Sequence, residues 1–206
     1  MTDADLAVAL RARDRRAYAV AWTELGPMVR RLVGRFFGPG ADTADLSQEV
    51  FLRFFRRIDE LRDPAGLRGF LVGICLGVAR NELRRARVRR WVGLTPGGEL
   101  PEASVAGPDL EAREAVRRFY AILDRVSAQD RSLFVARFLE KIEIAEIAVL
   151  HKMSFGTAKR RVARAGARVE RQLARDPALA GYVDRFGVGG QAAAQATGSD
   201  RRERRS

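Results

Sequence analysis

The sequence is poor in cysteine and histidine and has no long apolar run. Cys75 and His151 are the single cysteine and histidine among 206 residues. An internal disulfide and a zinc site built from Cys and His are therefore excluded. No apolar run approaches the ~20 residues that span a bilayer, and the N-terminal MTDADLAVALRARD lacks the basic start and apolar segment of a signal peptide. We expect a cytoplasmic protein that does not insert into a membrane.

Negative charge is also scarce, because 38 Lys and Arg face only 26 Asp and Glu and give a formal net charge of +12. Such a balance favours a polyanionic partner, since basic surface attracts phosphate at long range. A generally Arg-rich composition is the alternative explanation. The sequence shows no Gly-rich phosphate loop, paired-carboxylate cleft or nucleophile–base set. We therefore expect no enzymatic activity, no catalytic residue, no metal and no cofactor.

Helical periodicity runs through most of the chain, and no segment alternates as a strand would. We expect helices over about 3–25, 28–37, 43–61 and 67–90, with Gly26-Pro27 breaking the first pair. The Gly- and Pro-rich stretch GLTPGGELPEASVAGPD then reads as a linker. Helical spacing returns after it, and Ser127 can cap the next helix. The predicted fold is all-α, with two small helical domains joined by a flexible linker. The predicted parts are a first domain (1–91), the linker (92–112), a second domain (113–176) and a low-complexity, disordered tail (177–206).

The stretch EIAVLHKMSFGTAKRRVARA indicates a helix-turn-helix. Ser154 is a good N-cap for the second helix, whose Ala158, Val162, Ala165 and Val169 are spaced to face a core. Its Lys and Arg residues fall mostly on the opposite face, where they can meet phosphates and guanine edges. An amphipathic helix with a solvated basic face is the alternative. His151 is expected to be a polar turn residue, and Lys152 to sit where glycine would cost less if the turn is left-handed.

Two blocks of the sequence resemble bacterial RNA polymerase sigma factors of the extracytoplasmic-function (ECF) group. Asp42 to Leu71, which contains DLSQEVFLR, resembles the family's second conserved region. Leu123 to Ala165, which contains SFGTAKRR, resembles its fourth. The resemblance implies a transcription initiation factor that binds core RNA polymerase, directs it to a two-part promoter and helps open the duplex. Its implied partners are core polymerase and promoter DNA, with an anti-sigma factor as a further candidate.

The resemblance also implies a role for each block. The core-polymerase surface would comprise Asp45, Gln48, Glu49, Leu52 and Arg53. The downstream promoter element would meet the turn Arg62, Asp63, Pro64, Ala65, Gly66 and Leu67 and the basic helix end with Arg80, Asn81, Arg84, Arg85 and Arg87. Trp91 could stack on a base there. The upstream element would meet Ser154, Phe155, Gly156, Thr157, Lys159, Arg160, Arg161 and Arg164.

The chain departs from the family pattern in the fourth helix. The family usually has Arg and Asn where GICLG places Leu76 and Gly77, which bears on promoter melting. Two alternatives therefore stay open. One is a stand-alone helix-turn-helix regulator with a degenerate N-terminal domain, and the other is a sigma mimic that sequesters an anti-sigma factor. DLSQEVFLR discriminates against the regulator, because a simple repressor does not need that surface.

Overall fold

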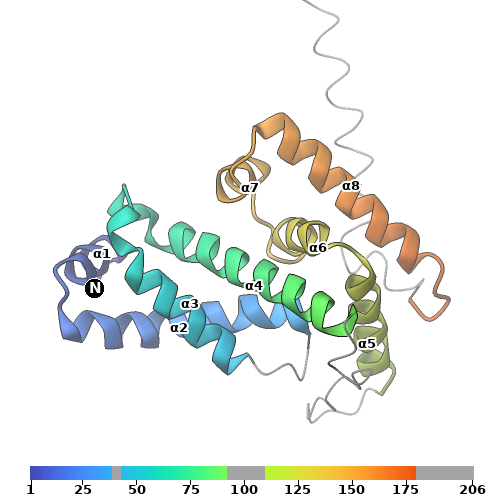
Figure 1. Cartoon of the computed structure of the whole chain (residues 1–206), viewed down its shortest axis with the longest axis horizontal. Helices are drawn as coiled ribbons and strands as arrows, with labels where there is room; N and C mark the ends of the chain where they lie inside the picture. Colours follow the sequence, from blue (N-terminus) through green and yellow to red (C-terminus); the bar gives the residue numbers. More distant parts are fainter. Residues whose placement is uncertain (39–42, 92–109, 180–206) are drawn as a thin grey trace, which may run out of the picture. The chain divides into compact units, whose positions relative to one another are not determined.

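The computed structural model describes residues 1–38, 43–91 and 110–179, and these residues are helical and contain no strand (Figure 1). The chain divides into two compact units, Met1–Ala103 and Ser104–Ser206. The all-α, two-domain fold expected from the sequence is confirmed. Most of the predicted linker and tail falls on 92–109 and 180–206, outside the described residues.

Within its described residues, the first unit contains four α-helices and two short 3₁₀ turns. The helices are α1 (Asp3–Arg11), α2 (Arg15–Phe37), α3 (Ala44–Arg56) and α4 (Leu67–Trp91), with η1 (Ile58–Glu60) and η2 (Pro64–Gly66) between the last two. The apolar faces of α2, α3 and α4 pack against one another. Their contact is rich in aromatic rings, with Phe54 at 6.3 Å from Phe51 and 6.2 Å from Phe70, centroid to centroid. Aromatic pairs of this kind supply much of the packing energy of a small domain.

The prediction that Gly26-Pro27 ends a helix is wrong, because α2 runs through both residues. Pro27 removes one backbone hydrogen bond and costs the helix about 3 kcal/mol. Pro27 itself is exposed to water, whereas Leu25, Gly26 and Val29 around it are buried in the core, so packing outweighs the loss. The chain breaks earlier, at Arg13, whose φ is 60°, and Asp14 then caps α2 by accepting from Arg16 N–H at 2.8 Å.

The expected helix over 43–61 is shorter than predicted. It ends at Arg56, and η1 follows directly. Ile58 and Leu61 nevertheless reach the core from this turn, as their spacing indicated. The change in direction sets up the exposed turn that leads into α4.

The second unit contains α5 (Leu110–Arg125), α6 (Ala128–Phe134), a π-helical turn η3 (Val135–Leu139), α7 (Ile144–Leu150) and α8 (Phe155–Leu173). Helix α5 includes the last three residues of the predicted linker. Ser127 caps α6 as predicted, by accepting from Asp130 N–H at 3.0 Å. Helix α8 packs on α5, α6 and α7. Its residues Ala158, Val162, Ala165 and Val169 are all buried, which confirms the predicted core face.

Candidate functional sites

Helix α3 presents the predicted docking residues on the face opposite its aromatic core. Val50, Phe51 and Phe54 are buried, whereas Asp45, Gln48 and Leu52 are exposed. The Leu52 side chain is 50% exposed, an apolar group set among polar ones. The amphipathic spacing of α3 therefore turns the DLSQEVFLR motif outward, where a partner can reach it.

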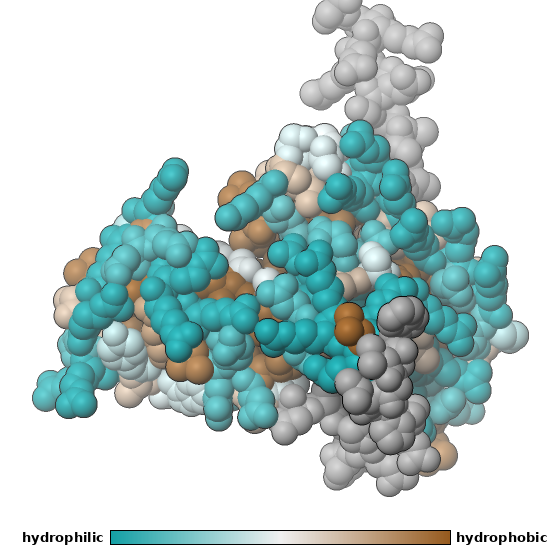
Figure 2. Space-filling model, viewed as in Figure 1, coloured by the Kyte–Doolittle hydropathy of each residue, from teal (hydrophilic) through white to brown (hydrophobic). Residues whose placement is uncertain are grey.

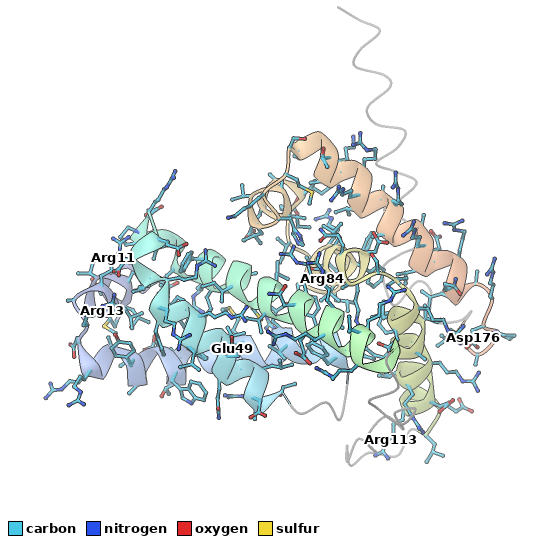
Figure 3. All side chains as sticks on the ribbon, viewed as in Figure 1. Arg11, Arg13, Glu49, Arg84, Arg113 and Asp176 are labelled. Atoms are coloured by element: carbon cyan, nitrogen blue, oxygen red, sulfur yellow. The ribbon has the colours of Figure 1, made fainter. Side chains whose placement is uncertain are left out.

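Glu49, labelled in Figure 3, forms an ion pair with Arg53. Arg53 Nε donates to Glu49 Oε1 at 2.6 Å. They are one helical turn apart and partly exposed, so the pair adds only ~0.3–0.5 kcal/mol to stability. A weak surface pair can be exchanged for contacts to a partner at little cost.

Trp22 of α2 is a surface candidate that the sequence pattern did not single out. Its ring packs on Phe51 at 4.7 Å between centroids, yet the residue is 41% exposed. Ala21 belongs to the buried apolar stripe of α2, and Trp22 is the next residue. A residue one position away from the stripe turns toward its edge, and this offset was the sign of exposure that the sequence offered.

The turn before α4 exposes most of its predicted DNA-contacting residues. Asp63 caps η2 by accepting from Ala65 N–H at 3.0 Å, and Arg62, Ala65 and Gly66 are also exposed. Leu67 is fully buried, so it anchors the turn in the core instead of lining its surface.

The basic end of α4 is partly neutralised from within the helix. Glu82 Oε1 accepts from Arg89 at 2.6 Å, and its other oxygen lies 3.9 Å from Arg85. Arg84 and Arg87 are exposed and form no ion pair with the described residues. They are therefore the strongest cationic candidates of this helix.

Arg80 differs from the other cations of α4 because it is partly buried. Desolvation, with a smaller effect from the positive charge of Arg84, lowers the pKa of Arg80 below its ordinary value. Asn81 beside it is exposed. Leu76, where the family pattern has a polar residue, is 3% exposed and belongs to the core. The side chains of Arg90 and Trp91 lie outside the described residues, so the stacking predicted for Trp91 stays a prediction.

In the second unit, α7, a tight turn and α8 form the helix-turn-helix. Ile144 and Ala148 pack on Ala158, and Met153 closes the contact from the turn. Lys152 has a φ of 53°. It therefore adopts the left-handed conformation, in which glycine would cost less than lysine. His151 lies in the turn, with its Nδ1 3.3 Å from Gln129 Nε2 of α6.

Ser154 caps α8 as predicted. Its Oγ accepts from Thr157 N–H at 3.3 Å and donates to Thr157 Oγ1 at 2.9 Å. Gly156 follows the cap, and a Cβ built there would meet nothing within 4 Å. The start of α8 is thus well ordered and sterically open, which suits a close approach to a duplex.

The cations on the outer face of the first three turns of α8 form no ion pair with the residues that the structure describes. Arg160, Arg161 and Arg164 are exposed and Lys159 is half-buried, and none forms an ion pair within the described part of the chain. Further along, Arg168 is held by Asp130 of α6. Positive charge without a counter-charge is therefore concentrated at the end of α8 nearest the turn.

Comparisons with known proteins agree with this geometry. Residues 21–89 match the family model "Sigma-70 region 2", which spans the DLSQEVFLR helix. The ECF RNA polymerase sigma-E factor of Escherichia coli is 24% identical over 183 residues, covering 84% of this chain and 95% of that protein, so the similarity extends into the second unit. These similarities support an ECF sigma factor that acts in transcription initiation, and nothing in them favours either of the two alternatives.

Other relatives support the family and the fold. A probable sigma factor, RfaY, of Xanthomonas campestris is 30% identical over 139 residues, covering 65% of this chain and 34% of that protein. CnrH, solved in complex with the cytosolic domain of CnrY, superposes with a TM-score of 0.59 at 21% identity over 84% of this chain and 98% of that one. RpoE of Bartonella quintana, solved with the anti-sigma factor NepR, superposes with a TM-score of 0.53 at 20% identity. The match covers 77% of this chain and 98% of that one.

No group of three or more His, Cys, Asp or Glu residues that could hold a metal ion occurs within 1–38, 43–91 and 110–179. Across the same ranges, no helix combines the length and apolar character of a membrane span. Figure 2 shows that hydrophilic side chains cover much of the visible surface of each unit, between small hydrophobic patches.

Proposed function

We propose that this sigma factor binds core RNA polymerase through the exposed face of α3 and directs it to a two-part promoter. Asp45, Gln48, Glu49, Leu52 and Arg53 form the docking surface. The observation that carries the proposal is the outward presentation of DLSQEVFLR in the unit that matches sigma region 2. A buried or collapsed motif could not serve as a docking face.

The two units divide promoter recognition in this proposal. The turn at Arg62–Gly66, with Arg84 and Arg87 of α4, meets the downstream element and supports opening, while Leu67 holds that turn in place. Helix α8 meets the upstream element through Lys159, Arg160, Arg161 and Arg164. None of these four residues forms an ion pair within the described part of the chain. This supports the assignment, because a cation without a counter-charge gains more from a phosphate or guanine than a neutralised one.

The remaining parts of the proposal follow from this role. The domains lie at 1–91 and 113–176, joined by the linker. The protein acts in the cytoplasm with polymerase and is not itself an enzyme, because polymerase performs the chemistry. Since the related RpoE was solved with an anti-sigma factor, such a factor is the further partner we propose.

The deciding experiment is gel filtration of the purified protein with bacterial core RNA polymerase. We expect stable co-elution that another sigma factor competes away. Failure to co-elute, with salt-sensitive DNA binding retained, would instead identify a stand-alone regulator. A protein that binds neither core polymerase nor DNA would instead be a sigma mimic that sequesters an anti-sigma factor, because that role requires neither kind of binding.

A further inference from the structure

Phe155, the first residue of α8, is an exposed aromatic side chain at the DNA-facing end of the helix. It is 57% exposed and makes no ring contact with the described residues. The other described phenylalanines of this unit, Phe119, Phe134 and Phe138, are all buried. Leaving a large apolar side chain in water forgoes a substantial part of its burial energy. Phe155 is therefore the aromatic group of the described unit that is free to contact a partner.

The neighbours of Phe155 limit what else can project from the first turn. The hydroxyl groups of Ser154 and Thr157 are engaged with each other in the cap. Gly156 carries no side chain, and the space around it is open. Phe155 is thus the largest group presented at the start of the helix.

The charges around Phe155 indicate a nucleic-acid partner. Lys159 lies four residues on and shares its helix face, and Arg160 and Arg161 follow. None of these cations is paired within the described residues. An apolar group set among free cations matches the major groove, where phosphates flank base edges and thymine adds an apolar 5-methyl group. Duplex DNA is therefore favoured over an apolar protein surface.

We propose that Phe155 contacts the 5-methyl group of one thymine in the upstream promoter element and so sets a preference for thymine at that position. The inference rests on the proposed function of α8 and adds to it the base that the helix start reads. Lys159 and the arginines supply phosphate attraction and guanine contacts, whereas Phe155 supplies the apolar contact. Thymine is distinguished from cytosine, and even from uracil, by this methyl group.

The test uses holoenzyme assembled from the full chain and core polymerase, on an upstream sequence that this holoenzyme selects from random duplex DNA. Each thymine of that element is replaced in turn by deoxyuridine, which keeps every hydrogen-bonding group and removes only the methyl. For the unaltered protein we expect one position at which the replacement weakens binding about fourfold, the value of one buried methyl(ene) group. Phe155→Ala should bind thymine and uracil promoters equally, and Phe155→Leu should restore part of the difference.

Val149 of α7 provides a matched control, because it is also exposed and apolar but does not belong to α8. Val149→Ala should keep the full thymine preference. The inference is overturned if no deoxyuridine replacement matters, or if Phe155→Ala keeps the same thymine-to-uracil ratio. If Phe155→Ala weakens binding equally on the thymine and the deoxyuridine promoter, and the preference for the methyl group is unchanged, Phe155 contacts a protein instead of the base. If no holoenzyme forms, the proposed function falls and this inference falls with it.

Discussion

Arg168 of α8 donates from Nη1 to Asp130 Oδ2 of α6 at 2.5 Å, across 38 residues of sequence. The Asp130 side chain is 13% exposed, whereas that of Arg168 is 47% exposed. The pair therefore fixes the helix that carries the free cations to the core of its own unit. Arg168 therefore already has a counter-charge, unlike Lys159, Arg160, Arg161 and Arg164, which form no ion pair within the described residues.

Removing Arg168 should loosen α8, because it leaves the nearly buried Asp130 carboxylate without this partner. Arg168→Met should lower the local free energy of unfolding by about 1–3 kcal/mol. Native-state hydrogen exchange of α8 amides, followed by mass spectrometry, measures this. Adding Asp130→Leu should recover part of the loss, since apolar pairs often replace buried ion pairs well.

Arg171→Met is the control for this prediction. Arg171 lies on the same helix, and among the described residues its side chain donates only to Ala167 O of that helix, at 3.2 Å. The hydrogen-exchange rates of the α8 amides should change little in Arg171→Met. Equal effects of Arg168→Met and Arg171→Met would mean that the ion pair to α6 contributes nothing measurable.

Gly166 of α8 packs directly against Phe138 of the π-helical turn. A Cβ added there would lie 2.8 Å from Cζ of Phe138, a buried ring stacked on Phe134 at 5.0 Å. Because the ring cannot yield without disturbing its stack, Gly166→Ala should destabilise the unit by about 1–3 kcal/mol despite alanine's better helix propensity. Thermal unfolding by circular dichroism measures the change.

Gly156→Ala is the matched control, since it lies on the same helix and its Cβ would meet nothing within 4 Å. It should be neutral or stabilising by up to about 1 kcal/mol. A stable Gly166→Ala variant would show that Phe138 has room that the structure does not indicate.

Local patterns predicted the faces of the helices and their caps, because these depend on neighbouring residues. The spacing of Ala158, Val162 and Val169 gave the buried face of α8, and Ser127 and Ser154 both cap as expected. The predicted site residues on α3 and α8 lie on exposed faces for the same reason.

Features that depend on distant contacts could not be read from the sequence. The predicted helix break at Gly26-Pro27 is wrong, because packing of α2 on α3 and α4 outweighs the hydrogen bond that Pro27 removes. Leu67 follows an exposed turn in the sequence, and only the packing of distant helices buries its side chain in the core. The pairing of Arg168 with Asp130 has no local signature at all.

Glu49 should be essential for polymerase binding but not for folding. Glu49→Arg reverses the charge on the docking face and sets two positive side chains, with Arg53, one turn apart. The free energy of unfolding should fall by no more than about 0.5 kcal/mol, whereas affinity for core polymerase should drop at least tenfold. Fluorescence anisotropy with labelled protein measures the affinity. Glu111→Arg, an equal charge change at an exposed position of α5, should bind normally. Unchanged affinity of Glu49→Arg would remove α3 from the interface.

The free cations of α8 should determine how promoter binding responds to salt. Each phosphate contact contributes about 0.9 to the slope of log affinity against log salt. Lys159→Ala and Arg161→Ala should each reduce the slope by about 0.9 if they meet phosphates. If they instead read bases, each should relax specificity at one base pair at a cost of about 1–3 kcal/mol. Arg171→Ala, at the opposite end of α8, should change neither the salt slope nor the base specificity. Promoter output that survives loss of both Lys159 and Arg161 would favour a sigma mimic, because sequestration needs the helical faces but no contact with DNA.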